Sequence, residues 1–186
     1  PAPAAAPRTA RSLESLMDNL GESFTTRLLR LIDERGLKDS TVYYVRGCTA
    51  LLDAVGGAIH HIGNIHKYAR REDVPEKTLF VITTDGYENA SRRYNYEAVR
   101  RMIERQKEKY GWEFIFLGAN IDAVQTAQRF GIDADRAVDY IPDAKGTQLN
   151  FEAMAETVAC YRMTGAVPAE PMEEIRKDMK KRGGRK

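Results

Sequence analysis

The chain of 186 residues has little cysteine and no long hydrophobic run. Its two cysteines, Cys48 and Cys160, stand far apart among apolar residues, so we expect buried free thiols and a reducing compartment. No apolar stretch has the length that a membrane helix needs. The opening PAPAAAPRTARS lacks the apolar core of a signal peptide. Together these absences predict a soluble, cytoplasmic protein that does not use a membrane.

An excess of one charge is also missing. The 29 basic and 27 acidic residues leave a net charge of +2, which gives no bulk reason to expect nucleic acid as a partner. The basic end KDMKKRGGRK is interpreted as a solvated terminus, with contact to nucleic acid or acidic lipid as the alternative. Neither a Gly-x-Ser-x-Gly elbow nor a glycine-rich phosphate loop occurs, which argues against serine hydrolases and nucleotide-binding enzymes.

Strand-like and helix-like patterns alternate along the chain. Strands are predicted at residues 41–45, 78–84, 113–119 and 136–141, and helices at 46–72, 96–111, 120–132 and 149–163. This alternation is typical of an α/β fold, and we predict a three-layer, doubly wound, mostly parallel sheet. The predicted organisation is a disordered leader at 1–12, one domain at 13–165 and a charged tail at 166–186, as a short helix or disordered.

Two helices carry detailed expectations. Thr49 stands where an N-cap residue would, with Asp53 in the first turn beside the positive helix end. Three glycines in that helix suggest close packing on the sheet. In the last helix, the larger apolar side chains are expected to face inward, namely Leu149, Phe151, Met154, Val158 and Tyr161.

Thr49 and Asp85 are the candidate metal ligands. Ligands of parallel α/β sheets bind beyond the carboxyl ends of the strands, where both residues are predicted to lie, with Asn120 and Asp122 on the next loop. A hydroxyl and a carboxylate suit a hard cation such as Mg²⁺. An N-capping threonine and an ordinary Asp-Gly turn account for the same two residues without a metal.

Three segments resemble von Willebrand factor A (VWA) domains, in particular a bacterial and phage-like subgroup. They are GCTALLDAVGGAI, LFVITTDGYENAS and YGWEFIFLGANIDAVQTAQRFGI, in that order. The resemblance implies a Rossmann-like fold and a metal-ion-dependent adhesion site. By that resemblance, Thr49 and Asp85 are ligands of Mg²⁺ or Mn²⁺. An acidic side chain of a protein partner completes the coordination, and no substrate is turned over.

The family's first metal-binding motif, Asp-x-Ser-x-Ser, is missing. The nearest string, DNLGES at 18–23, has Leu20 and Glu22 at the serine positions, and SLESLMDN is similar to the family's second strand. We therefore expect an incomplete domain in which metal binding is weak or absent. The predicted function is a non-enzymatic protein-interaction module with a partial adhesion site. Its predicted binding face consists of Thr49, Asp85, Asn89 and Asp122.

Two alternatives remain open. One is a metal-dependent hydrolase or phosphotransferase that uses Asp85, with Asp122 or Glu88 as the second acid. The other is a truncated domain without a function of its own. A zinc site at His60, His61 and His66 is disfavoured because their helical spacing does not suit a shared ion.

Overall fold

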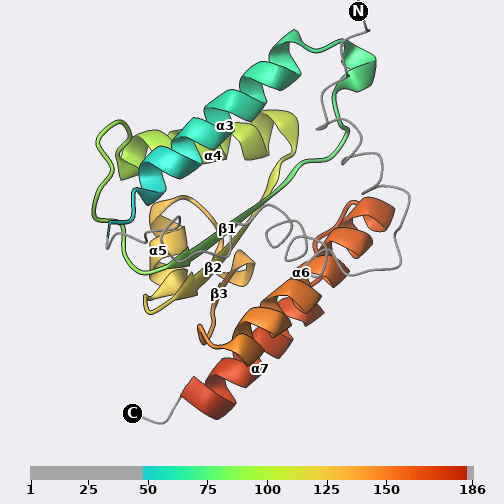
Figure 1. The fold of residues 1–186 in the computed structure, drawn as a ribbon. Coiled ribbons are helices and arrows are strands. Elements are labelled where there is room, and N and C mark those ends of the chain that lie inside the picture. The colour runs from blue at the N-terminus through green and yellow to red at the C-terminus, as the bar shows by residue number, and fades with distance from the viewer. Residues whose placement is uncertain (1–47, 184–186) are drawn as a thin grey trace, which may run out of the picture. The chain divides into compact units, whose positions relative to one another are not determined.

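A computed structural model describes residues 48–183. The strand predicted at 41–45, the leader at 1–12 and the string DNLGES lie outside this range. The helices are α3 (Leu51–Tyr68), α4 (Tyr96–Tyr110), α5 (Ala123–Arg129), α6 (Ala144–Thr164) and α7 (Glu170–Gly183), with short 3₁₀ turns at Arg71–Asp73 and Ala134–Arg136 (Figure 1).

The sheet consists of β1 (Leu79–Asp85), β2 (Glu113–Ala119) and β3 (Ala137–Asp139), in that order. All three strands are parallel, which confirms the predicted α/β class with a parallel sheet. In the register, Asp85 lies opposite Ala119, and Asp139 lies opposite Gly118. The carboxyl ends of the three strands therefore meet along one edge.

Helices cover both faces of this sheet. Successive side chains of β2 point to opposite faces, and they belong to two different hydrophobic clusters. Phe114 and Phe116 belong to the cluster with α3, α4 and α5. Ile115 and Leu117 belong to the cluster with α6 and α7. Figure 1 shows α3 and α4 apart from the pair α6 and α7, with the strands between them. Every residue of β2 after Glu113 is buried, which explains why the rest of the strand is free of polar side chains.

Close packing at a glycine of α3 is present, but its contact differs from the predicted one. A Cβ atom at Gly56 would lie 2.7 Å from the ring of Tyr94, so the glycine lets this aromatic side chain approach the helix. A Cβ at the neighbouring Gly57 would meet nothing within 4 Å. The contact at Gly56 is therefore with the segment before α4, whereas the sequence predicts a contact with the sheet.

The predicted inward face of α6 is wrong in part. Phe151 and Val158 are 59% and 40% exposed, although Tyr161 is buried as expected. The buried positions follow helical steps through smaller or polar residues, namely Gly146, Asn150, Ala153, Thr157 and Tyr161. Small side chains let α6 pack against α7 and the sheet, and the Thr157 hydroxyl is satisfied by donating to the Ala153 carbonyl at 2.7 Å.

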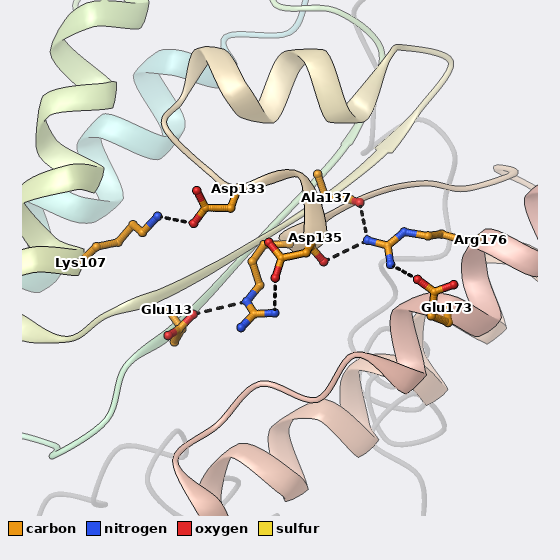
Figure 2. A network of polar contacts seen from close by, with 8 residues as sticks. Lys107, Glu113, Asp133, Asp135, Ala137, Glu173 and Arg176 are labelled. Atoms are coloured by element: carbon orange, nitrogen blue, oxygen red, sulfur yellow. Dashed lines mark hydrogen bonds and ion pairs between the residues drawn. The ribbon is translucent and has the colours of Figure 1, made fainter.

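The segment expected as a charged tail is part of the folded unit. Helix α7 buries Pro171, Met172 and Ile175. Arg176 of this helix donates to the carbonyl oxygens of Asp135 at 2.9 Å and Ala137 at 3.0 Å (Figure 2). The described fold therefore continues to residue 183.

Both cysteines are free, as predicted, but their predicted burial is wrong. Cys48 is exposed and Cys160 is half-buried. Cys48 precedes α3 on an exposed segment, so its apolar neighbours in sequence do not enclose it. Between residues 48 and 183, no helix combines the length and the apolar character that crossing a membrane requires.

Candidate functional site

The candidate site is the carboxyl edge of the sheet, where a polar residue ends each strand or follows it directly. Asp85 ends β1, Asn120 follows β2 and Asp139 ends β3. The Asn120 side-chain amide donates to Oδ1 of Asp85 at 2.5 Å, and this contact orients an exposed carboxylate. Asn120 has a φ of +56°, in the left-handed region that asparagine tolerates better than most residues.

Asp139 was not among the predicted site residues. Its Oδ1 accepts the backbone N–H of Ala123 at 2.8 Å. Burial raises the pKa of the Asp139 carboxyl, and the negative charge of Asp122 raises it further. Burial and the charge of Asp85 likewise raise the pKa of Tyr140, the next residue. The sequence signal was available, because an acid at the end of a third parallel strand must reach the same edge.

A cluster of side chains closes the N-terminus of α3, and we call Asp53, Glu88 and Ser91 the α3 clasp. The Glu88 carboxylate accepts the backbone N–H of Leu52 at 2.8 Å and both the N–H and the hydroxyl of Ser91. The Ser91 hydroxyl accepts the Asp53 N–H at 3.0 Å. The clasp thus satisfies helix donors that have no partner inside the helix.

The prediction that Thr49 is the N-cap residue is wrong. The N-cap is Ala50, whose side chain makes no capping bond, and Glu88 and Ser91 take that role from the loop after β1. Asp53 lies in the first turn as expected, but its carboxylate reaches outward to that same loop. It accepts the backbone N–H groups of Arg92, Arg93 and Tyr94 at 2.8–2.9 Å.

Thr49 is fixed to the loop that follows Asp85. Its N–H donates to Oδ1 of Asn89 at 2.7 Å, and the Asn89 N–H donates to the Thr49 carbonyl at 3.0 Å. Asn89 lies four positions beyond Asp85. The backbone of Thr49 is therefore bonded to the loop that leaves the carboxyl end of β1.

The other acidic side chains of this edge accept hydrogen bonds from backbone N–H groups. Asp122 caps α5 by accepting the Gln125 N–H at 2.8 Å, and Glu88 is engaged in the clasp. The hydrogen bond between the Asp85 and Asn120 side chains, by contrast, links the ends of β1 and β2. Across residues 48–183, no three His, Cys, Asp or Glu side chains group closely enough to hold a metal ion.

Comparisons of the chain with protein-family models, curated proteins and solved structures found no match.

The clasp makes a prediction about pH. Burial would raise the pKa of Glu88, but the hydrogen bonds from Leu52, Ser91 and Ala90 outweigh it and lower that pKa below its ordinary value. Hydrogen bonds from the loop also lower the pKa of Asp53. A folded-state pKa below the unfolded one stabilises the fold at pH values above the unfolded pKa. This contribution is lost as the pH falls through the folded pKa.

We therefore expect Glu88→Gln to lower the free energy of unfolding by about 1 kcal/mol at pH 7. The difference from the unsubstituted protein should shrink as the pH falls through the lowered pKa of folded Glu88, where its carboxylate takes up a proton. Urea unfolding between pH 7 and pH 3, a range that spans the ordinary carboxyl pKa of roughly 4, measures this difference in the free energy of unfolding. Glu97→Gln, in an exposed pair with Arg101, is the control and should have little effect. A Glu88→Gln deficit that is the same at every pH would contradict the assignment.

Proposed function

We propose that this chain is a non-enzymatic protein-interaction module of the VWA type, with a doubly wound, Rossmann-like sheet. Its binding face is the carboxyl edge with Thr49, Asp85, Asn89 and Asp122. The observation that carries the proposal is the exposed Asp85 carboxylate, oriented through one oxygen by Asn120. Its other oxygen makes no hydrogen bond to residues 48–183, so it is available to a ligand.

The charge of the edge favours a cation as that ligand. Asp85, Asp122 and Asp139 all lie at the ends of strands or at the start of α5. The N-terminus of α3 could attract an anion, but the Glu88 carboxylate of the same chain already occupies it. Because the edge is negatively charged and the α3 N-terminus is already occupied, the edge suits Mg²⁺ or Mn²⁺ better than a phosphate group.

The cation would be held by the Thr49 hydroxyl and the Asp85 carboxylate, with water at the remaining positions. Two protein oxygens bind Mg²⁺ weakly, because the ion gives up its hydration shell reluctantly. An acidic side chain of a protein partner would add the missing negative ligand. Metal binding and partner binding would then support each other.

The metal part is tested by Mn²⁺ titration, monitored by paramagnetic broadening of backbone amide signals. We expect saturable binding with a dissociation constant on the order of millimolar, and broadening centred on residues 85–89. Asp85→Asn should weaken binding by about tenfold or more. Thr49→Val should weaken it as well, because the substitution removes the hydroxyl at nearly constant volume.

The matched control is Asp73→Asn. Asp73 is an exposed acid of the 3₁₀ turn before β1, at the other end of that strand, where it pairs with Arg70. This substitution removes the same charge and should leave the Mn²⁺ titration unchanged. If Asp85→Asn binds Mn²⁺ as well as the unsubstituted protein does, Asp85 is not a ligand and the proposed face is wrong.

A further inference from the structure

A second concave region lies between α3 and α4, which run side by side in Figure 1. It has a cavity volume of about 530 Å³, within the range of roughly 300–1,000 Å³ that is usual for sites of small organic ligands. Its wall includes Trp112, which directly precedes β2 at the end of that strand opposite Asn120. We call this region the α3–α4 cleft. It is separate from the carboxyl edge, and the inference drawn from it does not depend on the proposed function.

The inner wall of the cleft is apolar. Ile59 and Trp112 form a floor that is only 1% and 3% exposed, so the accessible apolar surface comes from the partly buried Met102 and from Tyr110, which is 50% exposed. The His66 ring meets the Trp112 ring edge-on, with 5.4 Å between the ring centroids. Aromatic walls of this kind favour a ligand with a planar apolar body.

The outer wall carries positive charge that has no carboxylate partner among residues 48–183, although Lys67 lies over the ring of Tyr68. Lys67 and Arg105 line the cleft, are exposed, and form no ion pair with any carboxylate of residues 48–183. Arg100 and Arg101 of the same helix α4, by contrast, pair with Glu104 and Glu97. None of the described residues that line the cleft is an aspartate or a glutamate.

Neutral hydrogen-bonding groups accompany these charges. The side-chain amides of Asn64 and Gln106 also line the cleft, and neither is hydrogen-bonded to another residue of the described range. Guanidinium, ammonium and amide N–H groups are the donors that a carboxylate or sulfonate accepts from. The cleft thus joins an apolar inner wall to an outer wall of donors.

We propose that the α3–α4 cleft binds a small organic anion with a planar apolar body, of the aryl carboxylate class. The ring lies against Met102 and Tyr110, above the buried floor of Ile59 and Trp112, and the carboxylate faces Lys67 and Arg105. Gly63 of α3 leaves room for such a ring, because no side chain extends from it into the cleft.

The test uses 2-naphthoate as the probe and the full chain as the protein. Trp112 is the single tryptophan of the sequence, so its indole N–H gives one NMR signal that reports on the inner wall. We expect 2-naphthoate to shift this signal saturably. The uncharged 2-naphthamide has the same ring system and should bind about fivefold more weakly, since it lacks the charge that faces Lys67 and Arg105.

One pair of variants tests the location. Gly63→Leu fills the cleft from a helical position where the new Cβ meets only Gln106 Nε2 at 3.7 Å, so the helix tolerates it. This substitution should abolish the 2-naphthoate shift. Gly57→Leu is the control on the same helix, at a position outside the cleft where a Cβ meets nothing within 4 Å, and it should bind normally.

A second pair tests the charge. The double substitution Lys67→Gln and Arg105→Gln should weaken 2-naphthoate about fivefold and leave 2-naphthamide nearly unchanged. Arg101→Gln with Lys180→Gln removes the same net charge from residues outside the cleft and should have no effect. The proposal is overturned if 2-naphthoate does not shift the indole signal, if Gly63→Leu retains the shift, or if 2-naphthamide binds as tightly as 2-naphthoate.

Discussion

Replacement of Met172 by alanine is expected to lower the free energy of unfolding by about 3 kcal/mol. Met172 lies on α7, is 0% exposed, and belongs to the cluster on the α6–α7 face of the sheet. Removing most of its side chain takes away apolar contact and leaves a cavity that the surrounding helices cannot fully close. Urea unfolding at pH 7, roughly three units above the ordinary carboxyl pKa values, measures the change in the free energy of unfolding by far-UV circular dichroism.

Met163→Ala is the matched control, because Met163 of α6 is 84% exposed. The same chemical change at this position should alter the free energy of unfolding by less than about 0.5 kcal/mol. Equal effects of the two substitutions would mean that Met172 is not buried in solution. The docking of α7 against the sheet would then be wrong.

The role of α7 was hidden in the sequence by its charge. The segment from Glu170 to Gly183 is dominated by acidic and basic side chains, so its average composition is that of a solvated terminus. Its buried face is narrow, with Met172 and Ile175 one helical turn apart. Arg176, the residue directly after Ile175, adds two hydrogen bonds to carbonyl oxygens, which composition alone does not reveal. A pair of apolar residues at a helical step was the available signal.

The central strands were predictable because burial fixed their composition. The expected strand at 113–119 coincides with β2, and the one at 78–84 differs from β1 by one residue at each end. The inward face of α6 was harder to predict, since the pattern of large apolar residues differs from the pattern of burial. Close approach to α7 favours Ala153 and Thr157 on the inside and leaves Phe151 outside.

The candidate site was predictable only where strand ends define it. The rule that parallel strands end at one edge placed Asp85 and the loop with Asn120 there, and the structure joins these two residues by a hydrogen bond. The α3 clasp was not predictable in the same way. Glu88 and the Leu52 N–H that it accepts from are 36 residues apart, so local capping rules pointed to Thr49 instead. Long-range capping depends on the path of the loop, which local sequence patterns do not specify.

Gly146→Ala is expected to lower the free energy of unfolding by about 3 kcal/mol. A Cβ at Gly146 would overlap the backbone carbonyl oxygen of Ile141, which cannot rotate away as a side chain does. The turn into α6 would have to open. Asp143, the N-cap residue whose side chain accepts the Gly146 N–H at 2.7 Å, would then lose its capping bond. Chemical denaturation monitored by circular dichroism gives the size of the loss.

Gly57→Ala separates this clash from the general effect of replacing a helical glycine. A Cβ at Gly57 meets nothing within 4 Å, so alanine should raise the free energy of unfolding by about 0.5–1 kcal/mol through its better helix propensity. The two glycine-to-alanine substitutions should thus have opposite signs. A stabilising Gly146→Ala would show that the entry to α6 is more open than the structure describes. The position of the Asp143 cap relative to Ile141 would then have to be revised.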